Sequence, residues 1–503
     1  MSIVIPAFNE AKRLPLFLER VIAYCQASER TCEVIVVDDG SRDRTFDVAM
    51  SFAQRFAGLS VIRVRRNRGK GYAVKRGLFK ARGRVCLFMD ADGSTGPEEI
   101  DKNIHELLAG GYDIFVGSRV LSAADQVLRV KWYRKLIGKA FNFLVQALLF
   151  QRIKDTQCGF KMFKKEVVKP LFSRSYLRGF GFDIEILYLA HKMGYKVKEG
   201  PVSWHHVGGS KVNLAVDSLK MFLNILQIRN WHYTPINPKS KYMGPDEYRY
   251  MYEMEESHWW FVSHRRLAVR LVRSLGIPSP KILDAGSGTG WNLTTFNEIG
   301  QAVGIDVSRQ AIAFCLKRGL RNVKECPVEA IDYPDQAFDV VTCLDVLEHV
   351  PNPEEALREV RRVLKDRGKL VVTVPAFQTL WSQHDDALCH LRRYEKPSLR
   401  SDLEEAGFTV DRMGYFFFAS FFAVAPIRLF RRLRLFVSKA PKPHSDTTTR
   451  PPGFLNKVLR WLFTVELRLT DRDRLPFGTT LYAVASKALE HRDGSGGHFM
   501  NHG

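Results

Sequence analysis

The chain has 503 residues, of which 45% are hydrophobic and 26% are charged, so it is too long for one ordinary core and has the composition of a folded protein. Its formal net charge is +22, most of it in residues 1–240, which calls for an anionic partner such as a nucleotide, a nucleic acid or a membrane surface. The 8 cysteines form no C-x-x-C pair, which argues against a zinc site and a disulfide framework.

Strand-like and helix-like segments alternate from the start of the chain, which leaves no room for a signal peptide. The apolar strand-like runs are at 2–8, 33–40, 60–66, 84–92 and 113–119, and helices are expected over 12–27 and 44–57. This alternation predicts a mostly parallel, doubly wound α/β sheet. The proline-rich stretch 231–245 has no periodicity, so we expect a first domain over 1–230 and a linker over 231–254.

Two aspartates follow the fourth strand-like run, in "LFMDADGST" at 87–95. Side chains two apart on a strand share a face, so Asp90 and Asp92 can converge where Gly93 lets the chain turn. Two neighbouring carboxylates repel unless a positive charge lies between them. The pair is therefore either a divalent-cation site or a solvated turn.

The surrounding segments favour the cation site. The segments 4–10 and 36–45 end two other strand-like runs with polar residues, at the positions where doubly wound sheets bind ligands. The stretch 66–78 places five basic residues around Gly69 and Gly71, and 209–212 adds a flexible "GSKV". Together these segments indicate a pocket for a phosphorylated ligand.

These motifs resemble those of the family 2 glycosyltransferases with the GT-A fold, over residues 1–230. The strings "IKDTQCGFKMF" (153–163), "GFGFDIEILYLA" (179–190) and "VSWHHVGGSKV" (202–212) are similar to those of the dolichyl-phosphate glucosyltransferase branch. The dolichyl-phosphate mannosyltransferases are the neighbouring branch, and their middle motif looks less like "DTQCGF".

The resemblance implies a role for each polar residue of the pocket. The nucleotide sugar would be bound by Pro6, Asn9, Glu10, Asp39 and Lys70, and Mg²⁺ or Mn²⁺ would be held by Asp90 and Asp92. The negative charge of the leaving group would be stabilised, or the acceptor phosphate held, by Arg119 and Lys211. The base or orienting groups would be Asp183 and Glu185. A phosphomonoester acceptor is already anionic at neutral pH, so its attack should need positioning more than a strong base.

The second half has its own α/β series, with strand-like runs at 281–290, 302–308, 338–350 and 368–377. "LDAGSGTG" places Gly286, Gly288 and Gly290 between a strand and a helix. Asp306 ends the next strand, where an acidic residue suits a ribose diol. This pattern alone fits NAD as well as other nucleoside cofactors.

The run 338–375 resembles the class I S-adenosylmethionine-dependent methyltransferases, and the resemblance spans 255–415. It implies a Rossmann-like fold in which Asp284 and the three glycines hold the methionine moiety and Asp306 holds the ribose. Asp345, also assigned to the cofactor, would border the methyl site together with the residues up to His349. Pro327 stands where relatives often carry an acidic residue for the adenine, so that contact falls to Glu329 or to the backbone.

The segments 255–261 and 381–394 resemble parts of methyltransferases found with glycan-assembly enzymes. One interpretation puts His349, His384, Asp385, His390 and Arg393 on the methyl-acceptor side, with a base among them. The alternative for 381–394 is an ordinary polar lid. His258 and the two tryptophans after it fit a hydrophobic lid.

No run reaches the roughly 20 apolar residues of a spanning helix. The segments 136–150 and 414–427 are apolar with basic neighbours, and each fits either docking onto an anionic membrane surface or an ordinary core helix. We expect an amphipathic extension over 416–487, a disordered tail over 488–503, and a cytoplasmic protein peripheral on the cytoplasmic face of a membrane.

The chain is therefore predicted to join two transferases, one moving a hexose, most simply glucose from UDP-glucose, to a polyprenyl phosphate, the other methylating a glycan or lipid-linked intermediate. No nucleic acid partner is expected, because the charge excess is not in the methylating half. The rivals are a mannosyltransferase using GDP-mannose, a nucleic-acid methyltransferase with a non-catalytic first domain, and a non-catalytic scaffold.

Overall fold

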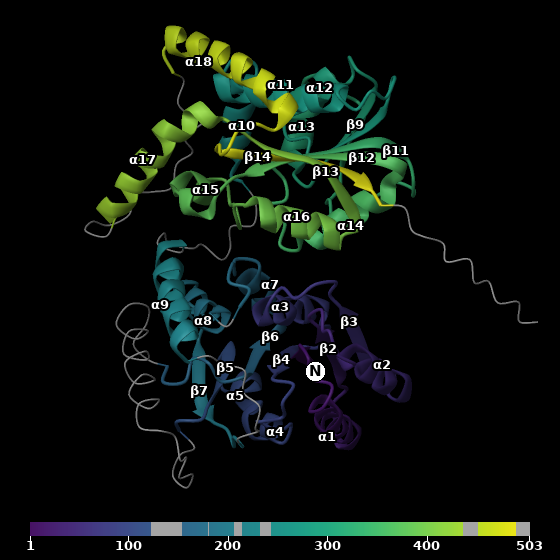
Figure 1. Cartoon of the computed structure of the whole chain (residues 1–503), viewed down its shortest axis with the longest axis vertical. Coiled ribbons are helices and arrows are strands. Elements are labelled where there is room, and N and C mark those ends of the chain that lie inside the picture. The colour runs from purple at the N-terminus through teal and green to yellow at the C-terminus, as the bar shows by residue number, and fades with distance from the viewer. Residues whose placement is uncertain (122–152, 180, 206–213, 232–242, 436–450, 489–503) are drawn as a thin grey trace, which may run out of the picture. The chain divides into compact units, whose positions relative to one another are not determined.

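The computed structural model describes residues 1–121, 153–179, 181–205, 214–231, 243–435 and 451–488. They divide into two compact units, and the chain passes from the first to the second near residue 241. Each unit holds a seven-stranded mixed sheet with helices packed on it (Figure 1). The expected pair of doubly wound α/β domains is confirmed.

The first sheet has the order β3-β2-β1-β4-β6-β5-β7, in which β6 runs antiparallel to both neighbours and the other pairs are parallel. Its strands are β1 (Ser2–Ala7), β2 (Glu33–Asp38), β3 (Leu59–Arg63), β4 (Val85–Met89), β5 (Ile114–Ser118), β6 (Phe160–Lys164) and β7 (Val197–Pro201). The five strands expected from the sequence are therefore all present.

Helices cover both faces of this sheet because alternate strand residues point to opposite sides. The helices are α1 (Leu14–Ala27), α2 (Thr45–Arg55), α3 (Lys70–Lys80), α4 (Glu99–Asn103), α5 (His105–Leu108), α7 (Lys165–Phe172), α8 (Phe182–Lys192) and α9 (Leu214–Trp231). On β1, Ile3 and Ile5 belong to the core formed with α1 and α2, and Val4 to the core formed with α3, α7 and α8.

The second sheet has the order β10-β9-β8-β11-β12-β14-β13, with β14 antiparallel to β12 and β13. Its strands are β8 (Lys281–Ala285), β9 (Gln301–Asp306), β10 (Val323–Glu325), β11 (Phe338–Leu344), β12 (Leu364–Pro375), β13 (Phe408–Phe416) and β14 (Thr480–Lys487). The parallel strands β8, β9 and β11 end at one edge of this sheet, which positions the loops that follow them.

The helices of the second unit are α10 (Pro245–Met254), α11 (Trp259–Arg273), α12 (Trp291–Phe296), α13 (Arg309–Lys317), α14 (Pro353–Val363), α15 (Gln383–Ala387), α16 (Lys396–Glu405), α17 (Phe418–Leu435) and α18 (Gly453–Glu466), with 3₁₀ turns η1 (Gln378–Leu380) and η3 (Leu467–Arg472). Helix α14 shows why such segments form, since Pro353 begins it, acidic residues occupy its first turn and arginines its last.

The limits of the second unit differ from those expected. Residues 245–254, expected to be linker, form α10, and Tyr252 stacks on Phe314 of α13 with ring centroids 4.7 Å apart. Strand β14 lies between β12 and β13, although the sequence placed it in an extension beyond the domain. The apolar run 414–427 is divided, because Phe417, at a φ of +63°, separates β13 from α17.

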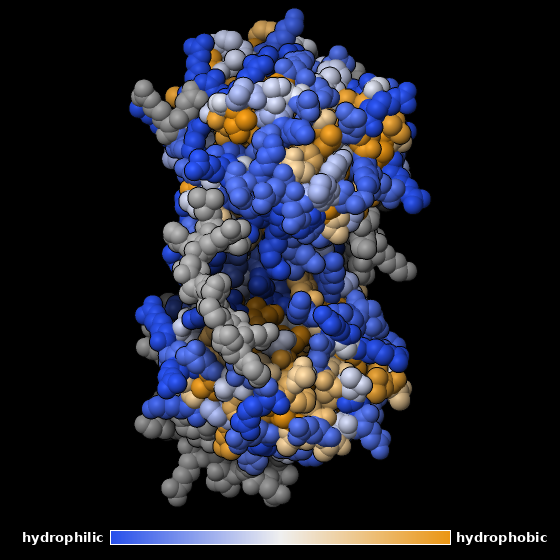
Figure 2. Space-filling view, turned by 90° about the vertical axis from the view of Figure 1, so that its right-hand side faces the viewer, coloured by the Kyte–Doolittle hydropathy of each residue, from blue (hydrophilic) through white to orange (hydrophobic). Residues whose placement is uncertain are grey.

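Among the residues that the structure describes, no helix has the length and apolar character to span a bilayer. All eight cysteines are free thiols. The face shown in Figure 2 is largely hydrophilic, with apolar patches on each unit. The apolar segment 136–150 and nearly all of the expected tail at 488–503 lie outside the described residues.

Candidate active sites

The carboxyl ends of β1, β2 and β4 bring polar loops of the first unit to one edge of its sheet, because these strands are parallel and adjacent. Pro6 is buried within β1. The loop after β1 is tied to the loop after β2, since the backbone N–H of Asn9 donates to Ser41 Oγ over 2.9 Å. In return, the N–H of Arg42 donates to Asn9 Oδ1 over 2.8 Å. The predicted nucleotide pocket therefore starts from two interlocked loops.

Asp39, which follows β2, holds the basic loop 66–69 at this edge. Its carboxylate accepts hydrogen bonds from the N–H groups of Arg68 and Gly69, over 2.9 and 2.7 Å, and from the Asn67 amide over 3.0 Å. Burial raises the pKa of Asp39 to about 6, although these donors oppose the rise. In this structure Asp39 positions the loop, and its contact with a base or ribose stays a prediction.

Four charged side chains alternate in sign near the ends of β4 and β6, and we call them the charged row: Asp90, Lys70, Asp183 and Lys161. Lys70 Nζ lies 2.6 Å from Asp90 Oδ1 and 3.9 Å from Asp183 Oδ2. Lys161 Nζ lies 2.6 Å from Asp183 Oδ1 and donates to the Cys158 carbonyl over 2.7 Å. The row joins α3, β6, α8 and the loop after β4 into one electrostatic unit.

Asp90 and Asp92 follow β4 with one residue between them, and both are half-buried. Burial opposes the ionisation of Asp90, but Lys70 beside it keeps the pKa of this carboxyl below its usual value. Asp92 Oδ1 accepts the N–H of Ser94 over 3.0 Å, and Asp92 Oδ2 lies 3.9 Å from Arg13 Nη1. Carboxylate oxygens are the donors that Mg²⁺ and Mn²⁺ prefer, so the residues present fit such a cation.

The other predicted residues of this unit differ in how they are placed. Arg119 is held by Asp155, its Nε and Nη2 each donating to one carboxylate oxygen over 2.8 Å. Glu185 is buried and accepts hydrogen bonds from Ser175 Oγ and from the N–H groups of 176 and 177, over 2.8 to 3.1 Å. Glu185 therefore holds the segment 175–177 in place, and its role as a base or orienting group stays a prediction. Lys211 lies outside the described residues.

Sequence reasoning missed Lys161, the buried end of the charged row, and Asp155, the partner of Arg119. A signal for Lys161 was present, because it stands between Phe160 and Met162 in an apolar strand and lysines are almost never fully buried without a partner. Asp155 had no comparable signal, since it lies in a polar loop.

The glycine loop after β8 has the backbone that the sequence predicts. Gly286, Gly288 and Gly290 have φ values of +85°, +53° and +93°, in the region that favours glycine. A Cβ atom on Gly286 would come within 2.3 Å of Val346 Cγ2. The N–H of Gly288 donates to Asp306 Oδ2 over 2.9 Å, which joins the loop to the end of β9.

Two buried carboxylates flank this loop. Asp284 Oδ1 accepts the hydroxyl of Thr342 over 2.6 Å, and among the described residues its Oδ2 has no hydrogen-bond partner. Burial raises the pKa of Asp284 to about 7 and that of Asp306 to about 6. Because buried polar atoms are normally paired, the unpartnered oxygen fits a cofactor that brings its own donors.

Asp345 and Glu329 are also predicted to bind the cofactor. Asp345, directly after β11, has a φ of +55°, a conformation that is uncommon outside glycine and that recurs at functional sites. Its Oδ2 lies 3.2 Å from His264 Nε2, and its Oδ1 accepts the hydroxyl of Thr373 over 3.2 Å. Glu329 is half-buried in the segment after β10, and its contact with an adenine stays a prediction.

Glu255 is a further residue that sequence reasoning missed. Its carboxylate accepts the hydroxyl of Thr289 in the glycine loop over 2.5 Å and pairs with Arg318. Burial raises the pKa of Glu255 to about 7, against the effect of Arg318. His258, expected in a hydrophobic lid, caps α11, its Nδ1 accepting the N–H of Trp260 over 3.3 Å.

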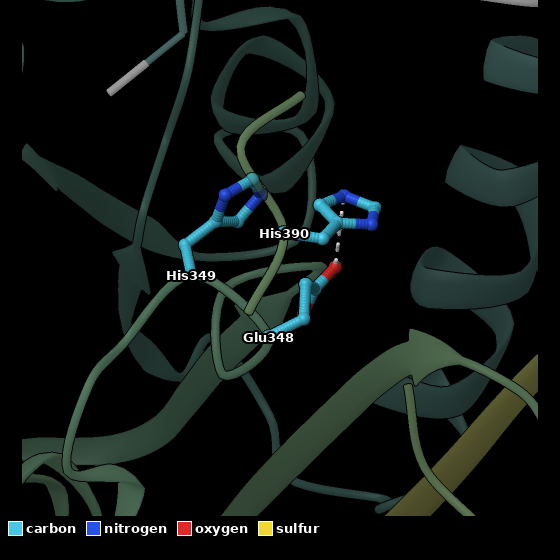
Figure 3. Close-up of side chains that lie close together, drawn as sticks. All are labelled: Glu348, His349 and His390. Carbon is cyan, nitrogen blue, oxygen red and sulfur yellow. Dashed lines mark ion pairs between the residues drawn. The ribbon is translucent and has the colours of Figure 1, made fainter. Parts of the chain in front are cut away.

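Acidic and histidine side chains gather at the carboxyl end of β11. Glu348 and His349 lie in the turn after β11, and His390 lies in the segment after α15, with the rings of His349 and His390 4.8 Å apart (Figure 3). The N–H of Leu391 donates to the Glu348 carbonyl over 2.7 Å, which ties the two segments together. Two of the predicted acceptor-side residues, His349 and His390, are therefore neighbours.

Asp385 anchors this cluster from α15. Its Oδ1 lies 2.9 Å from His390 Nδ1 and accepts from Arg393 Nε over 2.7 Å. Burial alone would raise the pKa of Asp385, but Arg393 and His390 hold it well below its usual value. His384 stands further off, its ring 6.1 Å from that of His390. The segment 381–394, expected to be either a base-bearing loop or a polar lid, thus holds the imidazole of His390 in a fixed orientation.

Comparison with known proteins agrees with this division. The model of glycosyl transferase family 2 matches residues 2–172, and that of a methyltransferase domain matches residues 283–372. The dolichyl-phosphate β-glucosyltransferase of Dictyostelium discoideum is 35% identical over 240 residues, covering 46% of this chain and 73% of its own. That of Homo sapiens is 35% identical over 241 residues, covering 46% of this chain and 74% of its own.

A solved structure with a related outline is glucosyl-3-phosphoglycerate synthase from Mycobacterium tuberculosis in complex with UDP. It is 20% identical, covers 48% of this chain and 82% of that chain, and has a TM-score of 0.37. A likeness at this level carries no argument about function.

Proposed function

Through its first unit this chain belongs to the dolichyl-phosphate β-glucosyltransferases of glycosyltransferase family 2, and from that membership we propose that the unit transfers glucose from UDP-glucose to a polyprenyl phosphate with inversion. The second unit contains a methyltransferase domain, which implies S-adenosylmethionine as methyl donor. Its acceptor, in this proposal, is a glycan or a lipid-linked intermediate of the same pathway.

The observation that carries the first activity is the charged row beside Asp92. In the proposal, Asp90 and Asp92 would hold Mg²⁺ or Mn²⁺, which would supply positive charge against the negative charge that builds on the departing nucleoside diphosphate. Lys70, 2.6 Å from Asp90, adds a fixed positive charge at the same place. Asp39 keeps Lys70 available by holding the loop that precedes α3.

The acceptor needs little proton chemistry. A phosphomonoester has a second pKa near 6, so it is largely dianionic at pH 7. One of its oxygens forms a bond to the anomeric carbon, and the bond from that carbon to the diphosphate breaks with its electron pair on the leaving group. Asp183 is paired with Lys161, so it serves to orient the two lysines and is not required as a base. Arg119, whose planar guanidinium suits phosphate, is the candidate for holding the acceptor.

Incubating the full chain with radiolabelled UDP-glucose, Mn²⁺ and dolichyl phosphate tests this activity. We expect a product that partitions into organic solvent and releases glucose in mild acid. Transfer from GDP-mannose with release of GDP would instead identify a mannosyltransferase. No transfer from either donor would favour a non-catalytic scaffold.

The observation that carries methyl transfer is the unpartnered oxygen of buried Asp284 beside the glycine loop. In the proposal, Asp284 and the loop bind the methionine moiety, Asp306 binds the ribose hydroxyls, and His349 and His390 border the acceptor. Label from methyl-tritiated S-adenosylmethionine should enter the lipid extract of a membrane incubation. Label in RNA would support the nucleic-acid methyltransferase, which the weak charge excess of this half disfavours.

We also propose that the chain binds the cytoplasmic face of an anionic membrane through its second unit. On α18 the exposed apolar side chains recur at helical spacing, namely Phe454, Val458, Trp461 and Val465. A depression beside Leu467 is lined by arginines of α11, namely Arg265, Arg266, Arg270 and Arg273. An apolar stripe near clustered arginines is the combination that docks onto anionic lipid.

A further inference from the structure

Glu348 is a buried carboxylate in the turn after β11. Its side chain is 0% exposed, and among the described residues neither Oε1 nor Oε2 has a hydrogen-bond partner. Burying a carboxylate in this way is costly unless a cation or donors satisfy it. The side chain is aimed at His390, whose Nε2 lies 4.0 Å from Glu348 Oε1, too far for a hydrogen bond (Figure 3).

That separation suits a metal ion between the two atoms. In the tetrahedral arrangement common for such ions, ligand atoms about 2.0–2.2 Å from the cation lie about 3.3–3.6 Å apart, so a shift of roughly half an ångström brings these two atoms to that spacing. His349 completes a set of three, since ligand atoms of Glu348, His349 and His390 all lie within 4.8 Å of one another. Side-chain movements of roughly 0.5–1.5 Å bring these atoms to that spacing, and His349 is the half-buried member of the set.

The surroundings of His390 are those of a metal ligand. Its Nδ1 lies 2.9 Å from Asp385 Oδ1, so the carboxylate holds the proton on Nδ1 and leaves the lone pair of Nε2 directed at Glu348. Asp385 is itself fixed, because its Oδ2 accepts the N–H of Ser382 over 2.8 Å and its Oδ1 accepts from Arg393 over 2.7 Å. Carboxylate–histidine pairs of this kind set the tautomer and the orientation of imidazole ligands.

We propose that Glu348, His349 and His390 bind a divalent first-row transition-metal cation, the class of ion that two imidazoles and one carboxylate favour. Three protein ligands leave coordination positions open, which suits a hydroxyl oxygen of the methyl acceptor. This role toward the acceptor rests on the proposed methyl transfer, whereas binding of the cation does not.

The test uses Co²⁺ and Mn²⁺ on the metal-free full-length chain carrying Asp92→Asn, which weakens the separate oxygen site of the first unit. We expect one equivalent of Co²⁺ by calorimetry, with the visible absorption of nitrogen ligation, and ¹⁴N modulation from imidazole in pulsed paramagnetic resonance of bound Mn²⁺. His349→Ala and Glu348→Gln should each weaken Co²⁺ binding at least tenfold. Asp385→Asn should weaken it about 10- to 100-fold.

His384→Ala is the matched control, because its ring lies near His390 but outside the set of three, and it should bind Co²⁺ as the parent does. Absence of ¹⁴N modulation in the parent overturns the proposal, as does unchanged affinity in His349→Ala or Glu348→Gln. The parent spectrum needs no further variant, so misfolding of a variant does not hide the result. Glucosyl and methyl transfer are measured with labelled donors, so either can stand if this site fails.

Discussion

Lys161 Nζ and Asp183 Oδ1 form an ion pair of 2.6 Å in the interior of the first unit, with side chains only 1% and 3% exposed. Lys161 comes from β6 and Asp183 from the first turn of α8. The same aspartate has Lys70 at 3.9 Å, so the pair links the apolar core to the candidate cation site. The buried charge of Asp183 therefore affects both the stability of the first unit and the electrostatics of the candidate cation site.

Lys161→Met should destabilise the first unit by about 3–5 kcal/mol, because it leaves the Asp183 carboxylate buried with its closest partner gone. The loss of stability is measured by urea unfolding of the full chain. The transition of the first unit is the one that added S-adenosylmethionine does not shift. Adding Asp183→Asn to Lys161→Met should recover part of the loss. The exposed pair of Arg20 and Glu98, 3.1 Å apart, is the control, and Arg20→Met should cost at most about 1 kcal/mol. A loss of similar size in both variants would contradict the buried-pair argument.

Local patterns predicted the strands well, but not the partners of buried charges. Asp90 and Asp92 were found because they directly follow an apolar run. The pairing of Lys161 with Asp183 depends on tertiary packing that no local pattern encodes. Asp183 and Glu185 lie in the same helical turn, yet they face different groups, one the lysines and the other the segment 175–177.

Sheet order was likewise beyond local reasoning. Strand β14 inserts between β12 and β13 from late in the chain, and pairing of strands so far apart in sequence is set by the completed core. The contact between Asp385 and His390 could not be predicted from the sequence either. The two residues are five apart, and they meet only because of the turn between them, whose geometry is not evident from composition.

Asp92→Asn should lower glucosyl transfer by at least about a hundredfold, since a cation on the departing diphosphate is worth several kcal/mol. Chelation by EDTA should do the same to the unaltered chain, and Mn²⁺ should restore it. Affinity for S-adenosylmethionine, measured by calorimetry, should stay unchanged in the variant, because Asp92 belongs to the other unit. Transfer retained by Asp92→Asn would refute the cation assignment.

Gly286→Ala should weaken binding of S-adenosylmethionine at least about tenfold, because the added Cβ would come within 2.3 Å of Cγ2 of Val346, in the segment after β11, and would displace the cofactor loop. Gly319→Ala is a close control: both glycines have a φ of +85°, but nothing lies within 4 Å of a Cβ at Gly319. Both variants pay about 1–2 kcal/mol for the left-handed backbone. Equal affinities in calorimetry would mean that the loop does not approach the cofactor closely.

The cofactor-free second unit should lose stability as the pH rises through about 6, because of Asp306. Burial raises the pKa of Asp306 to about 6 in the folded unit, whereas an unfolded aspartate titrates near 4. The folded state therefore binds the proton more tightly, so this contribution is complete below about pH 4 and is lost as the pH passes about 6. Relative to Asp306→Ala, the free energy of unfolding should fall by about 2–3 kcal/mol between pH 4 and pH 8. This free energy is measured by urea unfolding, from the transition that S-adenosylmethionine shifts. If the parent and Asp306→Ala differ in stability by the same amount at every pH, the raised pKa of Asp306 is contradicted.

Phe454→Ser combined with Trp461→Ser should reduce binding to anionic vesicles at least about tenfold. The two side chains are 80% and 67% exposed in one stripe of α18, and burying a large apolar side chain is worth about 1.5–3 kcal/mol. Flotation with phosphatidylserine vesicles measures the effect, and pure phosphatidylcholine should bind the parent more weakly, because the α11 arginines then lose their counter-charge. Leu316→Ser is the control, since Leu316 is 47% exposed on α13 and outside the stripe. If Leu316→Ser lowers binding as much as the double variant, general hydrophobicity and not the α18 stripe governs docking.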